Sequence, residues 1–464
     1  MTPRLPDGFT VRIDSGARVL DGGRVLLGGA PLRLLRLREA GAIDGDGIVV
    51  CDAISAAVAR RLLDAGLAHP DSSPDVRPPV TVVVPVKDNA SGVVRVVDAL
   101  RRDGVTDVIV VDDGSAVPLH IDGVRIIRHR RPRGPAAARN AGIDCADTEF
   151  VAVLDSDVVP RPGWLDRLLP AFSDPAVAMA APRIVALSLG GTERSPVRRA
   201  IARYEHARSS LDLGRDPARI AAGTPVAYVP SAAMVLRRSM FDEVGGFDEQ
   251  MHVGEDVDLC WRISAAGGRA RYVPASRVAH DHRVNPWDWL RRKAFYGTSA
   301  APLAVRHPGL VPPMAMSAAT LVGVVGVAGV SGVGTLLAIG AQAYAARKVA
   351  AALDGVPHRA PLVARVVARG FAGGLRQVVS AAWRHYWPVA LPAALVSRRM
   401  RRAVLAGALL DGVADWWEHR VPGGPGPLAH TVLLRLDDLA YGAGLWRGVL
   451  AARSPEALRP RITR

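Results

Sequence analysis

Residues 151–159 read VAVLDSDVV, a run of small and β-branched apolar residues that ends in two carboxylates, Asp155 and Asp157. A short apolar run of this kind is typical of a buried strand. Two negative charges at this spacing raise each other's pKa unless a cation joins them. The stretch therefore predicts a strand that delivers a pair of acids to a binding site.

Apolar strands alternate with helical patterns on the N-terminal side of this stretch. VTVVVPV (80–86) and VIVVD (108–112) read as strands, and residues 91–102 and 135–143 have helical spacing. This alternation predicts an α/β sheet with buried parallel strands. In such sheets the ligand binds beyond the carboxyl ends of the strands.

Polar side chains stand at three of these strand ends: Lys87, Asp88 and Asn89; Asp112, Asp113 and Ser115; and Asp155 and Asp157. Acids that converge on one edge favour a hard divalent cation such as Mg²⁺, which takes one or two carboxylates together with substrate phosphates. The sequence has no G-x-x-x-x-G-K-[ST] loop, and no G-x-G-x-x-G follows the first strand. A P-loop enzyme and a dinucleotide dehydrogenase are therefore disfavoured.

A second acidic pair lies in GEDVDLCWRI (254–263), where Gly254 precedes Glu255 and Asp256. The residues that follow have helical spacing, which places both acids at a helix N-terminus with its favourable dipole. A carboxylate held there can act as a general base, and simple capping of the helix is the alternative. Asp258 is expected to point elsewhere.

Two histidines, His280 and His282, follow a strand-like stretch in YVPASRVAHDHR (272–283). A neutral imidazole is a suitable ligand for a divalent metal. Solvated loop histidines are the alternative.

Five segments together resemble the ordered motifs of family 2 glycosyltransferases with the GT-A fold, over about residues 80–290. They are VVVPVKDN, VIVVDDGS, RGPAAARNAG, VAVLDSDVV and PSAAMVLRRSMFDEVGGFDEQMHVGEDVDLCWRISAAGG. The resemblance implies a Rossmann-like core that moves a hexose from a nucleoside-diphosphate sugar, with UDP-glucose as the expected donor and Mg²⁺ or Mn²⁺ as the cofactor. The Q-x-x-R-W motif of processive synthases is absent from the sequence, which favours one or a few additions.

The same resemblance implies a role for each site residue. Asp155 would face the ribose and Asp157 the metal ion, with His280 fitting the metal better than His282. Asp256 would be the general base of an inverting transfer, and Glu255 an acceptor-side or supporting group. The remaining residues of the nucleotide-sugar site would be Pro85, Asp88, Asp112, Asp113 and Arg139.

Residues 1–76 form a separate small unit that ends in the linker HPDSSPDVRPP. Strand-like pieces (FTVRI, RVLLGG) precede two helical patterns, PLRLLRLREAG (31–41) and ISAAVARRLLDAGL (54–67). The second pattern puts Ile54, Val58 and Leu62 on one side. The unit resembles a winged-helix or PqqD-like peptide-recognition module, and a structural cap is the alternative.

The whole net charge of +15 lies in the C-terminal part, because residues 290–464 carry 22 Lys and Arg against 7 Asp and Glu. No charged side chain occurs between Arg306 and Arg347. We expect a helical, membrane-associated region at 291–464, with an apolar hairpin at 308–346 that turns at VSGVG and has basic flanks on the cytoplasmic side. A buried helix pair in a soluble domain is the alternative. Nucleic acid is not expected as a partner, because no basic patch interleaves with aromatic residues.

The three-part arrangement is similar to that of the glycosyltransferases of the mycofactocin system. It implies a peptide-derived redox cofactor as the acceptor and a short β-linked glucan as the product. A membrane glycosyltransferase with a lipid-linked or cell-envelope acceptor is the alternative, and a scaffold with a decayed transferase core is disfavoured by the intact acids. Three widely spaced cysteines and an N-terminus without an apolar core predict a reducing location, at the cytoplasmic face of the membrane or in the cytoplasm.

Overall fold

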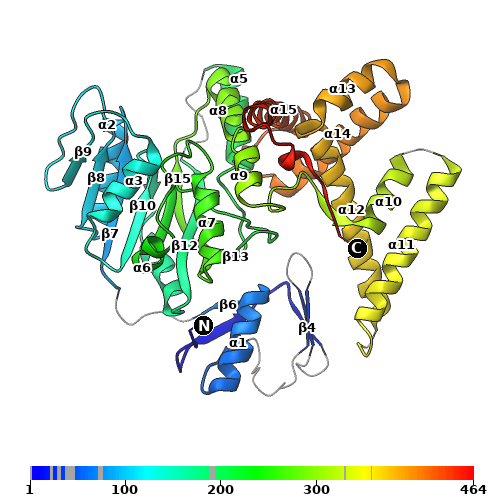
Figure 1. The fold of residues 1–464 in the computed structure, drawn as a ribbon, viewed down its shortest axis with the longest axis horizontal. Helices are drawn as coiled ribbons and strands as arrows, with labels where there is room; N and C mark the ends of the chain where they lie inside the picture. The colour runs from blue at the N-terminus through cyan, green and yellow to red at the C-terminus, as the bar shows by residue number, and fades with distance from the viewer. Residues whose placement is uncertain are drawn as a thin grey trace. The chain divides into compact units, whose positions relative to one another are not determined.

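The computed structural model describes residues 3–20, 25–28, 33–36, 47–71, 77–187, 194–328, 331–356 and 358–463. The chain forms two compact units. Unit 1 comprises Met1–Ser188 and Ser209–His282, and unit 2 comprises Leu189–Arg208 and Arg283–Arg464. Figure 1 shows the fold and labels most of its helices and many of its strands. The division into 1–76, 80–290 and 291–464 stays a prediction.

Unit 1 is built around a mixed sheet whose described strands have the order β11-β15-β12-β14-β10-β7-β8-β9. One half is parallel and consists of β7 (Val80–Val86), β8 (Val108–Asp112), β9 (Arg125–Arg128) and β10 (Phe150–Leu154). Every residue of β7, β8 and β10 is buried, as expected of parallel strands covered on both faces. The α/β prediction is confirmed for this half.

The other half of the sheet mixes directions. β14 (Ala233–Arg237) runs antiparallel to β10 and to β12 (Val177–Ala186), while β15 (Arg269–His280) runs parallel to β12. The short strands β11 (Val158–Pro160) and β13 (Ala218–Ile220) pair with β15 in the antiparallel sense. The stretch 151–159 is thus two strands, because a turn at 155–157 separates β10 from β11.

Two helices follow strands of the parallel half. α2 (Ala90–Arg102) turns Val93, Val96 and Leu100 into the core of the sheet. α3 (Pro135–Asp144) lies so close to the sheet that a Cβ on Gly142 would come within 2.3 Å of Val83 Cγ1. The other described helices packed around this sheet are α4 (Trp164–Leu168), η2 (Leu169–Ser173), α6 (Arg238–Glu243) and α7 (Glu255–Ala265).

The N-terminal part of unit 1 has one described helix and two small sheets. β1 (Thr10–Ile13) pairs with β5 (Gly47–Val49) and β6 (Ala68–Pro70), and α1 (Ala53–Ala65) packs on them through a core that includes Val58 and Leu62. Ile54, expected on the same face, is 50% exposed. The second sheet contains β2 (Arg18–Leu20), β3 (Val25–Gly28) and β4 (Arg33–Arg36).

The helix predicted at 31–41 is wrong where the structure describes it. Arg33–Arg36 form strand β4, which pairs antiparallel with β3. The physical reason is that pairing with β3 outweighs a weak local helix preference in so short a segment. Residues 29–32 and 37–46 lie outside the described residues, and the winged-helix likeness stays a prediction.

The C-terminal end of α1 docks on β13 and β15 of the large sheet. Arg219 donates to the Asp64 carbonyl at 2.7 Å and Arg271 to the Leu63 carbonyl at 3.2 Å. Arg269 donates to both carboxylate oxygens of Asp64 at 2.7 Å. Guanidinium groups are favourable at a helix C-terminus, where the last carbonyls need donors and carry partial negative charge. The small module is therefore attached to the sheet by directed hydrogen bonds.

Unit 2 is helical, as predicted for residues 291–464, and also includes α5 (Pro196–Arg208). The close contact of α8 (Pro286–Gly297) with α15 (Pro427–Ala452) depends on glycines, since a Cβ on Gly444 would lie 1.7 Å from the Ala294 carbonyl oxygen. The other elements are α9 (Ala300–Arg306), α10 (Ala318–Ala328), α11 (Gly332–Ala352), α12 (Arg359–Arg384), α13 (Trp387–Val396), α14 (Arg398–His419), η3 (Glu456–Leu458) and the paired strands β16 (Ala315–Ser317) and β17 (Arg461–Thr463).

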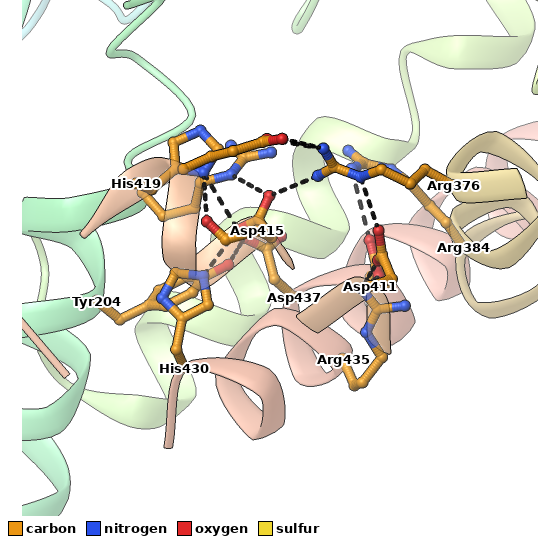
Figure 2. A network of polar contacts seen from close by, with 12 residues as sticks. Tyr204, Arg376, Arg384, Asp411, Asp415, His419, His430, Arg435 and Asp437 are labelled. Atoms are coloured by element: carbon orange, nitrogen blue, oxygen red, sulfur yellow. Dashed lines mark hydrogen bonds and ion pairs between the residues drawn. The ribbon is translucent and has the colours of Figure 1, made fainter. Parts of the chain in front are cut away.

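A buried polar network connects four helices of unit 2 (Figure 2). Asp415 on α14 accepts from His430 Nε2 on α15 at 2.7 Å and from Arg208 Nε on α5 at 3.3 Å. Asp411, one turn earlier, accepts from Arg435 at 2.7 Å and from Arg376 on α12 at 3.1 Å. Burial opposes the shift, but hydrogen bonds from His419 and His430 and the charge of Arg208 hold the pKa of Asp415 well below its usual range.

The apolar stretch predicted as a hairpin forms the helices α10 and α11, which pack on each other with Ser331 capping α11. Residue 330, the first of the predicted turn, and residue 329 before it lie outside the described residues. No helix among the described residues is both long and apolar enough to cross a membrane. Several large side chains of the pair are nonetheless exposed: Val322, Val325, Val327, Val333, Leu336, Leu337 and Ile339.

Candidate active site

The predicted acids gather at the carboxyl edge of the parallel strands. β7 ends at Val86 and β8 at Asp112, and β10 ends one residue before Asp155. Because these strands are parallel and adjacent, their carboxyl ends share one edge of the sheet. The structure therefore brings Asp88, Asp113 and Asp155 to the same edge.

The backbone of the Asp155–Ser156–Asp157 turn is held at each of its three carbonyls. The Asp155 carbonyl accepts from the Val158 amide at 3.0 Å, and the Asp157 carbonyl accepts from the Asp281 amide at 3.0 Å. The Ser156 carbonyl accepts from Asn89 Nδ2 at 3.3 Å. Both carboxylates thus project from a turn whose main chain is held in place by hydrogen bonds.

Arg139 on α3 connects this turn to the second acidic pair. Its Nη2 donates to Asp155 Oδ1 at 2.7 Å and its Nη1 to Glu255 Oε1 at 2.9 Å. The Arg139 side chain is only 4% exposed, and its guanidinium lies 5.6 Å from the centre of the Phe247 ring. Burial raises the pKa of Asp155. The charge of Arg139 opposes this effect, and the charge of Asp157 adds to it.

Asp256 is the acid next to this bridge, in the first turn of α7. Gly254, with φ of 85°, makes the sharp entry into the helix. Asp256 Oδ2 accepts from the Ser231 amide at 3.2 Å, and Oδ1 accepts from the Val257 amide at 2.8 Å. Desolvation and the charge of Glu255 raise the pKa of Asp256 to about 7. A carboxyl group with such a pKa can accept a proton near neutral pH.

Glu255 and Asp258 each form an ion pair with an arginine of the same unit. Glu255 is buried, binds Arg139 and lies 3.4 Å from Ser231 Oγ. Asp258 pairs with Arg262 at 2.7 Å, which confirms that it points away from the site. The three acids at the start of α7 therefore have three different environments, and Asp256 alone of them is partly exposed.

The acids at the first two strand ends hold the loops of the site together. Asp88 has φ of 54° and accepts from the Ala116 amide at 2.8 Å. Asp112 is fully buried and binds Arg128 and the Ser115 amide. Although burial opposes it, hydrogen bonding from Ser115 lowers the pKa of Asp112, with a further contribution from Arg128. Pro85, within β7, is buried beside β8.

Asp113 has three donors of its own. His129 Nδ1 lies 2.8 Å from its Oδ1, the Arg133 amide donates to Oδ1, and the Gly134 amide donates to Oδ2 at 2.8 Å. These contacts order the 129–134 loop in front of α3. The nucleotide-binding roles of Asp88, Asp112 and Asp113 stay predictions.

His280, at the end of β15, lies beside the acidic turn. Its Nε2 is 3.5 Å from Asp157 Oδ2, and its Nδ1 is 3.1 Å from His282 Nδ1. Among the described residues, no group of three or more His, Cys, Asp or Glu side chains could hold a metal ion. A carboxylate and an imidazole fit an ion that takes its other ligands from a diphosphate and water.

Comparison with known proteins identifies the family. Residues 81–245 match the family model for glycosyl transferase family 2. In an alignment of 475 positions the chain is 49% identical to the pre-mycofactocin glycosyltransferase of Mycobacterium tuberculosis strain H37Rv, and the alignment covers 99% of each protein. The chain belongs to the pre-mycofactocin glycosyltransferase family. It is therefore a glycosyltransferase, as the motifs implied, with a family 2 domain on the α/β sheet of unit 1.

More distant similarities are shorter or weaker. The succinoglycan biosynthesis protein ExoO of Rhizobium meliloti is 32% identical over 224 residues, which are 44% of this chain and 60% of that protein. A mannosyltransferase of Pyrobaculum calidifontis, solved with GDP-Man and Mn2+, aligns with 75% of this chain and 90% of its own at 18% identity and a TM-score of 0.38.

Three residues of this glycosyltransferase site were not predicted from the sequence as members of it. Ser231 contacts both Asp256 and Glu255, His129 contacts Asp113, and Asn89 contacts Ser156. Ser231 lies in the PSAAM motif and Asn89 at a strand end, so the sequence contains a feature that could have identified each as a site residue. His129 lies among arginines in RHRRPRG, where nothing distinguishes it from a surface residue.

Proposed function

We propose that this glycosyltransferase transfers glucose from UDP-glucose to pre-mycofactocin, a peptide-derived acceptor, with inversion at the anomeric carbon. Repeated transfer would build a short β-linked glucan. The name and the full-length similarity of the M. tuberculosis relative support the acceptor. The observation that carries the mechanism is the partly exposed Asp256 beside Glu255 and Arg139.

The reaction is a displacement in which an acceptor hydroxyl attacks the anomeric carbon and the nucleoside diphosphate leaves. The hydroxyl proton must depart as the new bond forms, and Asp256 would accept it. Glu255 is occupied by Arg139 at 2.9 Å, so its negative charge serves to raise the pKa of Asp256 and is not itself presented to the acceptor. The amides of Ser231 and Val257 orient the Asp256 carboxylate.

Asp157 and His280 would hold the divalent cation, Mg²⁺ or Mn²⁺. When bound, the ion neutralises the diphosphate leaving group. Asp155, held by Arg139 at 2.7 Å, would face the ribose. Pro85, Asp88, Asp112 and Asp113 lie within or just after the last residues of β7 and β8 and would complete the nucleotide-sugar site.

The α10–α11 pair would rest on the cytoplasmic face of the membrane without crossing it. Exposed Leu336, Leu337 and Ile339 supply an apolar surface, and Arg347 and Lys348 follow on α11. Apolar side chains beside basic ones suit the boundary between acyl chains and anionic headgroups.

The donor and the metal are tested by following UDP release from UDP-glucose with added Mn²⁺ or Mg²⁺. We expect saturating EDTA to abolish turnover and Asp157→Ala to remove metal-dependent hydrolysis of the donor. Turnover in EDTA would exclude the metal role. The identity of the acceptor is tested by offering pre-mycofactocin and a polyprenyl phosphate and analysing the products. Transfer of glucose to the lipid alone would overturn the proposal that pre-mycofactocin is the acceptor.

A further inference from the structure

Asn89 occupies two positions at once, at the start of a helix and beside the acidic turn. Its Oδ1 accepts from the Gly92 amide at 3.2 Å, which caps α2. Its Nδ2 donates to the Ser156 carbonyl at 3.3 Å and lies 3.1 Å from Ser156 Oγ. One amide side chain therefore joins the N-terminus of α2 to the middle of the Asp155–Ser156–Asp157 turn, 67 residues away.

The contact has no room for a larger neighbour. A Cβ added to Gly92 would lie 2.2 Å from Asn89 Nδ2 and 2.3 Å from the Ser156 carbonyl oxygen. Since Gly92 has ordinary helical geometry within α2, positive φ is not the reason for a glycine here. The close approach of the helix to the turn is the reason.

The three carbonyls of the turn differ in what holds them. Backbone amides of Val158 and Asp281 hold the first and the third. The Ser156 carbonyl is held by a side chain, and it belongs to one of the two peptide groups that connect Asp155 to Asp157. If this carbonyl were released, the turn could change its conformation between Asp155 and Asp157 while the strand pairs on either side, which end at Leu154 and start at Val158, stay intact.

We propose that Asn89 is a positioning residue for donor and metal binding, because it fixes the main chain between Asp155 and Asp157. This inference rests on the proposed function of those two acids. Asn89 itself would touch neither the sugar nor the ion. Loss of an outer-shell partner that orients metal ligands typically weakens metal binding by about 10–100-fold, and we expect an effect at the lower end.

Asn89→Ser separates the two roles of the side chain. Serine is as good a helix cap as asparagine, but it is too short to reach Ser156. The probe is UDP with Mn²⁺, measured by isothermal titration calorimetry, and thermal unfolding is measured in parallel. We expect an unchanged unfolding midpoint and a Kd about tenfold higher. Equal Kd values for Asn89→Ser and the wild type would overturn the inference.

Two further variants keep the test decisive. Gly92→Ala retains Asn89 but forces it or the Ser156 carbonyl to move, so it should also raise the Kd. Ser156→Ala retains the carbonyl and should leave the Kd within about twofold of the wild type, which distinguishes main-chain positioning from a contact of the hydroxyl.

If Asp157→Ala binds UDP and Mn²⁺ as tightly as the wild type, the proposed function of the turn fails. If Asp157→Ala loses binding while Asn89→Ser and Gly92→Ala do not, only the role of Asn89 fails.

Discussion

Arg139 Nη1 donates to Glu255 Oε1 at 2.9 Å, across 116 residues of sequence and in a buried position. The other arm of the same guanidinium holds Asp155. The acid that would bind the donor and the acid beside the proposed base are thus fixed by one planar group. Arginine suits this place because its fork of donors can bind two carboxylates at once.

Arg139→Lys should therefore impair donor binding and turnover together. Lysine retains the positive charge but cannot direct two donors in the same plane. Loss of one charge-assisted hydrogen bond costs about 1.5–3 kcal/mol, so we expect KM for UDP-glucose to rise about tenfold or more and kcat to fall. Steady-state kinetics at saturating acceptor measures both. An unchanged KM would show that the bridge does not shape the donor site.

Asp256→Asn tests the general base. Asparagine keeps the size and the acceptor for the Ser231 amide but cannot take a proton, and a positioned base contributes about 10²–10⁴-fold. We expect kcat to fall at least a hundredfold while the Kd for UDP and Mn²⁺ stays near that of the wild type. The assignment fails if more than about a tenth of kcat remains, a loss below the low end of general-base effects. A product that retains the α configuration would exclude inversion.

The pH dependence follows from the same carboxylate. The pKa of Asp256 is raised to about 7, and the base must be deprotonated to act. The rate should therefore fall about tenfold per pH unit below pH 7, and Asp256→Asn should lose this limb from its residual activity. Measurement of kcat/KM from pH 5.5 to 8.5 checks the slope. A flat profile in the wild type would contradict the assignment.

The same raised pKa predicts an effect on stability. An acid whose pKa is higher in the folded state than its ordinary 3.8 binds more protons when folded, so stability falls as the pH rises from about 4 through about 7. Asp256→Asn removes this unfavourable charge. We expect its unfolding midpoint to exceed that of the wild type at pH 8 and the difference to shrink at pH 5. A lower midpoint at pH 8 would argue against a desolvated carboxylate.

Asp415→Ala tests the network of unit 2. It would leave the buried His430 and the Arg208 guanidinium without their shared acceptor. Breaking a buried pair costs about 3–5 kcal/mol, so the free energy of unfolding, measured in urea, should fall by about that amount. Glu418→Ala is the matched control, because Glu418 is an exposed partner of Arg376 and such pairs contribute about 0–1 kcal/mol. Equal shifts in the two variants would contradict a structural role for the buried network.

Membrane binding is tested with vesicles of phosphatidylglycerol and phosphatidylcholine. We expect the protein to sediment with them and to remain bound at about 1 M salt, where charge effects reach only about 3 Å. Leu336→Asp together with Leu337→Asp should release it, because both side chains are more than half exposed on α11. Val117→Asp, at an exposed site of unit 1, is the control. Full release of the wild type by salt would exclude apolar insertion.

The sequence by itself determined the parts of the site that lie close together along the chain. The apolar runs before Asp112 and Asp155 predicted buried parallel strands, and Gly254 before Glu255 and Asp256 predicted a helix start with two acids. Local patterns suffice here because strand ends and helix starts depend on a few neighbouring residues. The order of five such segments also predicted the family.

Only the tertiary structure decided which groups share a hydrogen bond across the chain. No feature of the sequence distinguishes the role of Glu255 from that of Asp256. In the structure Glu255 is the charge partner of Arg139, and Asp256 is the candidate base. Arg33–Arg36 read as helical, yet pairing with β3 makes them a strand. In both cases the deciding free energy comes from groups distant in sequence, namely a buried guanidinium and a neighbouring strand, and no local pattern records their approach.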